Sequence, residues 1–269
     1  MYKIIALDLD DTLLNKKKEI SEKNYQALKE CEALGIKIVI ATGRPFNGTK
    51  EVLEKLKLFN TDTYVICFNG GLIYSLKDNK VIYKAMLEGK DIKAIYQDSL
   101  LKKINFHAFR ENQSLITPKL SEYTLYEAKI NNITANICDI NTISDDDLFI
   151  KCMCIDNESI LSPLVDYFVE KYQKQYAVFR SAPFFLEFLN KKATKGNALK
   201  YLADYLNVDI KDTMSFGDSE NDLSMILAAG LGVAMENSYP HIKKNADFVT
   251  LACEEDGVSY AINKFILKK

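Results

Sequence analysis

The chain has 269 residues, of which 48% are hydrophobic and 27% are charged. A chain of this length buries about three quarters of the surface that it exposes when unfolded, which excludes a disulfide-stapled scaffold or a disordered tail. Its 35 Lys and Arg residues against 37 Asp and Glu residues leave a net charge of −2, which argues against a nucleic-acid-binding protein.

The apolar runs of the sequence have the length of strands. The run at residues 36–41 is far shorter than the roughly 20 residues of a membrane span, and three acidic residues, at positions 8, 10 and 11, end the first apolar run. The six cysteines include no second Cys or His pair that would complete a metal site, which indicates free thiols. We therefore expect a cytoplasmic protein with no membrane partner.

The N-terminal residues alternate between buried strands and helices. Strands are expected at residues 4–7, 36–41 and 64–68, with a helix between Ser21 as N-cap and Gly35 as C-cap and another beginning at Pro45. The same alternation returns after residue 190, with a helix at 196–206, a strand at 213–216, a helix from Ser219 and a strand at 231–234. This order is typical of a parallel sheet with helices on both faces.

The middle of the chain has a different order of elements. Helices are expected at residues 91–101, after Ser121 and at 160–172, and strands at 104–109, 114–116, 148–155, 176–180 and 184–189. Two helix–strand–strand units thus flank a central piece. This order of elements predicts an α+β module inserted into the α/β core.

Polar segments follow the strands of the predicted parallel sheet. The segments are Asp8-Leu9-Asp10-Asp11-Thr12, Thr42-Gly43-Arg44, Asn69-Gly70-Gly71 and Gly217-Asp218-Ser219-Glu220-Asn221-Asp222. Lys195 lies at the start of the helix that precedes the strand at 213–216. Ligands bind beyond the carboxyl ends of parallel strands, so we expect these segments to converge on one solvated rim.

Several carboxylates on one rim repel each other and repel any anion, unless a hard cation such as Mg²⁺ lies among them. Lys195 would add positive charge, and Thr42 with nearby backbone amides could bind phosphate oxygens. An aspartate can attack a phosphorus atom whose charge has been neutralised, and a second aspartate can transfer the proton. The residue pattern therefore favours phosphoryl transfer.

These motifs resemble those of the haloacid dehalogenase (HAD) superfamily of phosphatases, and specifically its Cof-type sugar-phosphate hydrolases. The matching segments are DLDDT at 8–12, ATGR at 41–44, Lys195 within TKGNAL, and GDSEND at 217–222. The resemblance implies a Rossmann-like HAD core formed by residues 1–84 and 185–269, with an inserted α/β cap domain at residues 85–184. It also implies Mg²⁺-dependent hydrolysis of a small phosphomonoester, a sugar phosphate or similar metabolite, through an aspartyl-phosphate.

The resemblance also assigns roles to single residues. It implies that Asp8 is the nucleophile, that Asp10 is the general acid/base, and that Asp8, Asp218 and the main chain of Asp10 ligate the metal. It further implies that Thr42, Gly43, Lys195 and Asn221 contact the phosphate. Asp222 would support the metal ligands without binding the metal itself. Arg44 and Asn69 are candidates for substrate contact.

Some of these residues have structural alternatives. Ser219 and Asp222 have the spacing of a capping box, and Lys195 could be an ordinary solvated lysine at a helix start. Asn69-Gly70 could form a hairpin turn, and Arg44 could pair with a carboxylate.

Other functions fit parts of the pattern. A phosphomutase or phosphotransferase would return the phosphoryl group to a substrate instead of water, and only product analysis separates it from a phosphatase. A response-regulator receiver also clusters Asp, Thr and Lys, but it has about half this length and no insertion. A non-catalytic metabolite-binding regulator on the same fold is disfavoured by the complete set of Asp8, Asp10, Lys195 and Asp218. We expect a small phosphorylated metabolite as the partner and a monomer or homodimer as the assembly.

Overall fold

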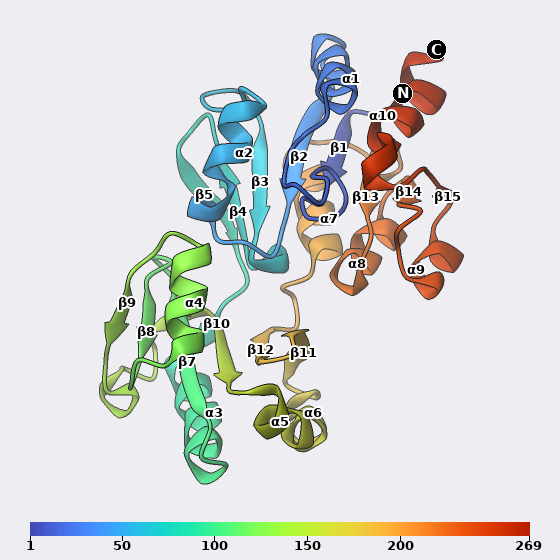
Figure 1. The fold of residues 1–269 in the computed structure, drawn as a ribbon. Helices are drawn as coiled ribbons and strands as arrows, with labels where there is room; N and C mark the ends of the chain where they lie inside the picture. Colours follow the sequence, from blue (N-terminus) through green and yellow to red (C-terminus); the bar gives the residue numbers. More distant parts are fainter. The chain divides into compact units, whose positions relative to one another are not determined.

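A computed structural model describes residues 1–269, and the chain forms two units (Figure 1). The first unit comprises residues 1–46, 50–83 and 194–269, and the second comprises residues 47–49 and 84–193. The inserted unit ends at Ala193, whereas the sequence analysis expected its end at residue 184. The reason is that strand β12 (Phe185–Asn190) pairs with strands β10 (Leu148–Ile155) and β11 (Tyr176–Ala182) of the inserted unit.

The first unit contains one sheet of eight strands. In spatial order they are β15 (Phe248–Val249), β14 (Leu231–Ala234), β13 (Thr213–Gly217), β1 (Ile4–Leu7), β2 (Lys37–Ala41), β3 (Tyr64–Cys67), β4 (Leu72–Ser75) and β5 (Lys80–Lys84). The strands from β15 to β3 pair in parallel, as the alternation of strands and helices predicts. Strand β4 returns antiparallel to β3, so the sheet is mixed.

The turn between β3 and β4 was open to two interpretations from sequence. Phe68 and Asn69 have φ values of 51° and 55°, which end β3 at Cys67, one residue before the expected end. A short 3₁₀ turn, η2 (Phe68–Gly70), then leads directly into β4. Asn69-Gly70 therefore does form a hairpin turn, and the sequence prediction had not included the two strands that follow it.

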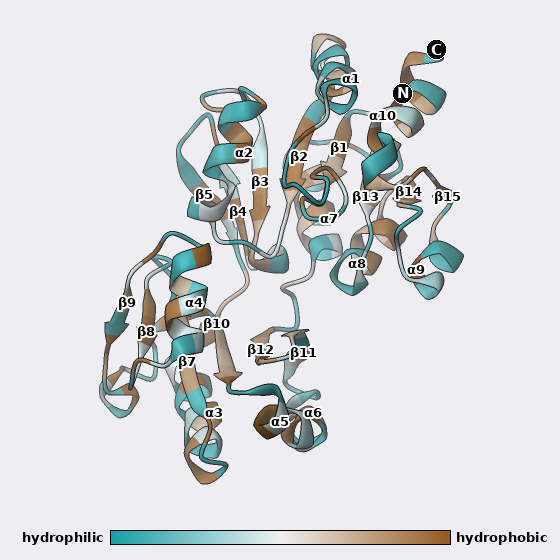
Figure 2. Ribbon diagram, viewed as in Figure 1, coloured by the Kyte–Doolittle hydropathy of each residue, from teal (hydrophilic) through white to brown (hydrophobic).

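The helices of the first unit bury one apolar side each. They are α1 (Glu22–Ala33), α2 (Lys50–Lys55), α7 (Lys195–Tyr205), α8 (Glu220–Ala228), α9 (Pro240–Asn245) and α10 (Gly257–Ile262), with short turns η5 (Ile210–Asp212), η6 (Cys253–Glu255) and a final π-helix η7 (Asn263–Leu267). The short turn η1 (Phe46–Thr49) has only its first residue in this unit, since residues 47–49 belong to the second. Ile4 and Val39 on the sheet form one buried cluster with Leu199 of α7 and Met225 of α8. Ile5 and Ile38, their neighbours along the strands, point to the opposite face and are also buried. Figure 2 shows the resulting apolar strands between more polar helices.

The inserted unit contains a second sheet. Its strands, in spatial order, are β11 (Tyr176–Ala182), β12, β10 (Leu148–Ile155), β7 (Asn105–Arg110), β8 (Leu115–Thr117) and β9 (Ala135–Ile137), and β6 (Leu87–Glu88) pairs with β10. Its helices are α3 (Gly89–Leu101), α4 (Glu122–Ile130), α5 (Glu158–Leu161) and α6 (Val165–Tyr172), with 3₁₀ turns η3 (Ile140–Thr142) and η4 (Ser162–Leu164). The helix expected at residues 160–172 is divided by η4, which contains Pro163, a residue without a backbone N–H.

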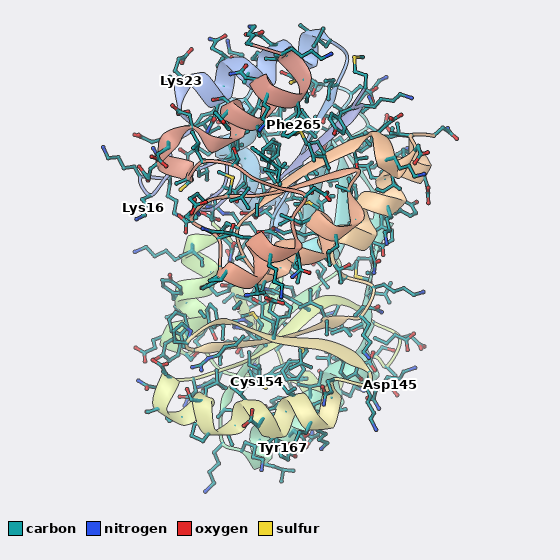
Figure 3. The ribbon with its side chains drawn as sticks, turned by 90° about the vertical axis from the view of Figure 1, so that its right-hand side faces the viewer. Lys16, Lys23, Asp145, Cys154, Tyr167 and Phe265 are labelled. Atoms are coloured by element: carbon teal, nitrogen blue, oxygen red, sulfur yellow. The ribbon has the colours of Figure 1, made fainter.

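The two faces of the inserted sheet are covered differently. On one face Phe106, Cys154 and Phe188 pack with α3 and with Phe168 of α6. Figure 3 shows Cys154 on its strand and Tyr167 on the helix beyond it. On the other face Lys151 contacts Glu127 of α4. The inserted unit is therefore an α+β module with a core of its own. No helix in either unit has the length and apolar character needed to span a membrane.

Candidate active site

The polar segments expected to converge do so at the carboxyl ends of β1, β2, β3 and β13. Hydrogen bonds join the segment after β1 to α7 and to the segment after β13, and join the turn after β3 to α8. An ion pair joins the segments after β1 and β2. All of these residues belong to the first unit. Parallel strands bring the segments together although they lie up to about two hundred residues apart in the chain.

Lys195 is the centre of a buried ion triad. Its Nζ donates to Asp8 Oδ1 at 2.6 Å and to Asp222 Oδ1 at 2.6 Å. Lys195 and Asp222 are 0% exposed and Asp8 is 6% exposed. This burial corrects the expectation of a solvated rim, because the lysine is enclosed between two carboxylates and is not an ordinary surface residue at a helix start.

The start of α7 positions this lysine. Thr194 is the N-cap, and its side chain accepts a hydrogen bond from the backbone N–H of Asn197. The following Gly196 lies so close to α8 that a Cβ atom there would be 2.1 Å from the carbonyl oxygen of Ser224. The N-cap and the tight contact between α7 and α8 therefore fix the position of the Lys195 backbone at the start of α7.

Burial opposes the ionised form of each group in the triad, and an oppositely charged neighbour favours it. Burial, together with the charge of Asp222, raises the pKa of Asp8 to about 8, against the lowering effect of Lys195. Burial opposes the charged form of Lys195, but Asp222 and Asp8 more than compensate and raise the pKa of the lysine. The lysine therefore remains a cation in the absence of any ligand.

Asp8 keeps one oxygen available. Lys195 engages Oδ1, and Oδ2 takes part in no hydrogen bond. Among all buried side-chain nitrogen and oxygen atoms, only Asn24 Nδ2 lacks a hydrogen-bond partner, so the free Oδ2 of Asp8 is open to solvent or to a ligand. A carboxylate held through one oxygen and open at the other can act as a nucleophile or as a metal ligand.

Asp222 has two tasks, as its two sequence interpretations suggested. Its Oδ1 pairs with Lys195, while its Oδ2 accepts the backbone N–H groups of Asp218 at 3.0 Å and Ser219 at 3.1 Å. With Ser219 it forms the capping box of α8. Gly217 makes room for this side chain, because a Cβ atom there would lie 2.3 Å from the Cβ of Asp222. Both carboxylate oxygens of Asp222 are thus already occupied by the protein.

Asp218 is the second open carboxylate of the site. Its side chain accepts one hydrogen bond, from the hydroxyl of Thr12 at 3.0 Å. Burial and the nearby Asp222 raise its pKa to about 6, against the effect of Thr12. One carboxylate oxygen each from Asp8, Asp218 and Asp222 lies within 4.8 Å of the others. An all-oxygen, acidic set of this kind suits a hard divalent cation, and Asp8 and Asp218 have the free capacity to bind it.

Asp10 lies outside this cluster, in an ion pair with Arg44. The guanidinium donates from Nε to Oδ2 at 3.0 Å and from Nη2 to Oδ1 at 2.6 Å, and Lys18 Nζ donates to Oδ1 at 2.9 Å. Burial raises the pKa of Asp10, but Arg44 and Lys18 outweigh it, so the pKa is lowered overall. Arg44, a candidate for substrate contact, therefore pairs with a carboxylate, as its structural alternative proposed.

The remaining predicted residues form a polar rim next to the triad. The Thr42 hydroxyl accepts the backbone N–H of Arg44 at 3.2 Å, and its carbonyl accepts the N–H of Asn69 at 3.0 Å. Asn221 Nδ2 donates to Asn69 Oδ1 at 2.9 Å. A Cβ atom at Gly43 would lie 3.1 Å from the same Asn69 oxygen. Asn69 thus connects the segments after β2, β3 and β13.

Two residues of the site escaped the sequence argument. Thr12 contacts Asp218, and Lys18 contacts Asp10. The position of Thr12 within the DLDDT motif was a signal that could have found it. Lys18 is one of three consecutive lysines in a loop, and nothing in the sequence separates it from its neighbours.

Comparison with known proteins assigns this chain to a family. The haloacid dehalogenase-like hydrolase family matches residues 5–262, which is nearly the whole chain. The chain therefore belongs to the haloacid dehalogenase-like hydrolases.

Its similarity to individual proteins narrows the class. It is 38% identical to "Putative phosphatase YxeH" of Bacillus subtilis, over 100% of both chains. It is 30% identical to the 5-amino-6-(5-phospho-D-ribitylamino)uracil phosphatase YwtE of the same organism, over 98% of each. Together with the solved structures, these relatives place the chain among the phosphatases of the family.

The solved structures share the fold over their full length. A haloacid dehalogenase-like hydrolase from Bacteroides thetaiotaomicron matches with a TM-score of 0.86 and 31% identity, over 99% of this chain and 100% of that one. The sugar phosphatase BT4131, of HAD subclass IIB, matches with a TM-score of 0.80 and 26% identity, over 98% of both chains. The resemblance to the Cof-type phosphatases is confirmed by these matches.

Proposed function

We propose that the protein hydrolyses a small phosphomonoester, a sugar phosphate or similar metabolite, in an Mg²⁺-dependent reaction through an aspartyl-phosphate. The observation that carries the proposal is the pairing of Asp8 with buried Lys195, which leaves Asp8 Oδ2 free beside the open carboxylate of Asp218. The proposed reaction needs a fixed nucleophile and compensation for the charge of a phosphate dianion. This pairing supplies the first need directly and the second in part.

In the first half-reaction Asp8 Oδ2 attacks phosphorus. A bond forms between Asp8 and phosphorus, the bond from phosphorus to the ester oxygen breaks, and Asp10 gives a proton to the departing alcohol. Lys195 holds Asp8 in place and stabilises the negative charge on the transferring group. Thr42, Gly43 and Asn221 are proposed to bind the phosphate oxygens that remain unreacted.

In the second half-reaction water attacks the phosphorus of the aspartyl-phosphate. Asp10 takes the proton from water, the bond between Asp8 and phosphorus breaks, and inorganic phosphate leaves. Arg44 and Lys18 stabilise the ionised form of Asp10, which is the form that activates water. For the earlier proton donation these ion pairs must open, and a bound phosphate that attracts Arg44 would favour this opening.

Asp8, Asp218 and the main-chain carbonyl of Asp10 are the groups proposed to hold Mg²⁺. The bound cation would supply positive charge against the phosphate oxygens. Asp222 would contribute indirectly, because it orients the backbone of Asp218 and the side chain of Lys195.

The relatives support the substrate class. One relative is named for a phosphorylated ribityl compound, and another is titled a sugar phosphatase. The substrates in these names are phosphate esters of small polyhydroxy molecules. The core residues contact features that all such esters share. We therefore propose that the inserted unit acts as a cap that selects the leaving group, and that the protein works as a monomer or homodimer in the cytoplasm.

A panel of phosphate esters, assayed for phosphate release with Mg²⁺, tests the proposal. Wild-type protein should release phosphate from one or more sugar phosphates, lose activity in EDTA and regain it with Mg²⁺. Asp8→Asn should be inactive and serves as the control for contaminating phosphatases. Full activity in EDTA would reject the metal requirement.

Comparison of the two leading aspartates tests the covalent route. With p-nitrophenyl phosphate the leaving group needs little acid assistance, so Asp10→Asn should still form the aspartyl-phosphate. It should hydrolyse this intermediate about 10²–10⁴-fold more slowly than wild type. Acid quench should then show one phosphoryl group on the peptide containing Asp8, and hydroxylamine should remove it. Turnover by clean Asp8→Asn, or a label on Asp10, would reject this assignment. Transfer of the phosphoryl group to a second sugar instead of water would indicate a phosphomutase.

A further inference from the structure

Thr12 is a buried residue with a single side-chain partner in another part of the chain. It is 0% exposed, it follows β1, and its hydroxyl donates to Asp218 Oδ1 at 3.0 Å across 206 positions of sequence. The backbone of Thr12 is held separately, by a hydrogen bond from its N–H to the carbonyl of Leu9. The side-chain hydroxyl is therefore a direct link between the segment that carries Asp8 and the segment that carries Asp218.

The main chain and the side chain of Asp218 are held by different groups. Asp222 Oδ2 accepts the backbone N–H of Asp218 at 3.0 Å, which fixes the main chain. No other group of the protein donates a hydrogen bond to the Asp218 carboxylate, so the hydroxyl of Thr12 is its one hydrogen-bonding restraint on rotation. Without that hydroxyl, the carboxylate could turn away from Asp8 at no cost in protein hydrogen bonds.

A metal-binding carboxylate is commonly oriented by a hydrogen bond to one of its oxygens from a group that does not touch the metal. Loss of such a partner typically costs 10–100-fold in metal affinity. We infer that Thr12 is a positioning residue for the divalent-cation site, and that its hydroxyl holds the Asp218 carboxylate toward Asp8. This inference rests on the proposed function, because it requires a cation at Asp8 and Asp218.

A purely structural role for the hydroxyl predicts different behaviour. A buried hydroxyl needs an acceptor, and Asp218 would then satisfy Thr12 without any consequence for cation binding. In that case Thr12→Val, which keeps the branched shape and removes the hydroxyl, would alter the free energy of unfolding and leave the affinity for cations unchanged. Thr12→Ser keeps the hydroxyl and removes only a methyl group, so it is the matched control.

The test is Mn²⁺ binding to metal-stripped full-length protein, measured by electron paramagnetic resonance of the free ion. Thr12→Val should bind Mn²⁺ about 10–100-fold more weakly than wild type, and Thr12→Ser should stay close to wild type. Thr12→Ala, also without the hydroxyl but smaller, should follow Thr12→Val, and it replaces that variant if the valine variant does not fold. Unfolding in urea with EDTA reports separately on stability.

The outcomes separate this inference from the proposed function. If Asp218→Asn binds Mn²⁺ as tightly as wild type, Asp218 is not a metal ligand. The metal part of the proposed function would then fail together with this inference. If Asp218→Asn loses binding while Thr12→Val and Thr12→Ala bind like wild type, only the role of Thr12 is overturned. Equal weakening in Thr12→Ser and Thr12→Val would also overturn it, because the hydroxyl would then not be the cause.

Discussion

Lys195 shows how burial changes the consequence of a single charge. In the interior, an ion pair recovers the cost of removing its charges from water only when the partners are close and fully hydrogen-bonded. Lys195 lies close to both partners, at 2.6 Å each, and Asp222 is hydrogen-bonded through both of its oxygens. The same lysine that would bind a phosphate therefore also holds two buried carboxylates together before any phosphate arrives, and its loss should affect both activity and folding.

We predict that Lys195→Met abolishes phosphatase activity and lowers the free energy of unfolding by about 3–5 kcal/mol, because Asp8 and Asp222 lose their buried cation. Urea unfolding and phosphate release measure the two effects. At neutral pH, Asp8→Asn combined with Lys195→Met should be about as stable as Lys195→Met alone, because burial keeps the Asp8 carboxyl protonated once the lysine no longer lowers its pKa. A single variant with wild-type stability would show that the triad does not contribute to folding.

His107 is a buried histidine that the proposed chemistry does not use. It is 0% exposed in the inserted sheet, with Nε2 at 3.0 Å from Met153 Sδ. Burial, and secondarily the charge of Lys151, lower its pKa to about 3. In the unfolded chain the pKa of histidine is about 6.5, so between pH 6.5 and pH 3 the unfolded chain carries a proton that the folded one lacks. Stability is therefore lost as the pH falls through this window.

We predict that this group alone lowers the free energy of unfolding by about 1.4 kcal/mol for each pH unit below 6.5, until the pH approaches 3. The glutamine of His107→Gln cannot take up a proton. At pH 8 this variant should have a lower free energy of unfolding than wild type, and at pH 4.5 that difference should be smaller by about 2–3 kcal/mol. Urea unfolding of both proteins across this range measures the difference, which cancels the contribution of the carboxylates. A difference independent of pH would contradict a neutral buried His107.

At the scale of elements, the hairpin turn between β3 and β4 positions the start of α7. Gly70 has φ +98°, and a Cβ atom there would lie 2.2 Å from the carbonyl oxygen of Thr194, the residue that caps α7. Gly35 also has a positive φ, +79°, but nothing lies within 4 Å of its Cβ position. The two glycines therefore share a left-handed conformation and differ in whether a second element packs against them.

We predict that Gly35→Ala costs about 1–2 kcal/mol of stability, the price of a left-handed alanine, with normal activity. Gly70→Ala should cost more and should also reduce kcat, because the clash moves Thr194 and with it Lys195. Thermal unfolding and steady-state kinetics of the two variants give the comparison. If Gly70→Ala behaves like Gly35→Ala in both measurements, the turn does not hold α7 in place.

At the scale of the whole molecule, the chain forms two units with separate cores. The proposed catalytic residues all lie in the first unit, and the second has its own sheet and apolar cluster. Such an inserted module can change in sequence without disturbing the chemistry of the core. Its proposed contribution is selection among leaving groups and exclusion of water from the intermediate.

We predict that exchanging residues 84–193 for the corresponding unit of a relative changes the ranking of substrates and leaves the dependence on Mg²⁺ unchanged. Exchange of residues 85–184, the sequence-based boundary, should give a less stable protein, because β12 of one parent must then pair with β10 and β11 of the other. Kinetics on the ester panel and thermal unfolding measure both. An unchanged ranking in a folded chimera would contradict the proposed role of the inserted unit.

The sequence by itself determined the alternation of strands and helices, the insertion and the segments that carry Asp8, Thr42, Lys195 and Asp218. These features depend on local patterns: apolar runs, caps, and polar residues directly after strands. The strand at Leu148–Ile155 was predicted to the residue because all but its first residue are buried and its length is that of a strand.

Only the tertiary structure decided the partners of these side chains. The contact of Lys195 with Asp8, the pairing of Arg44 with Asp10 and the contact of Thr12 with Asp218 all join residues more than 30 positions apart. The second boundary of the insertion likewise depended on which sheet β12 joins. Local pattern shows that a residue is polar and follows a strand, but how deep it lies and which charge it meets are set by packing between distant segments.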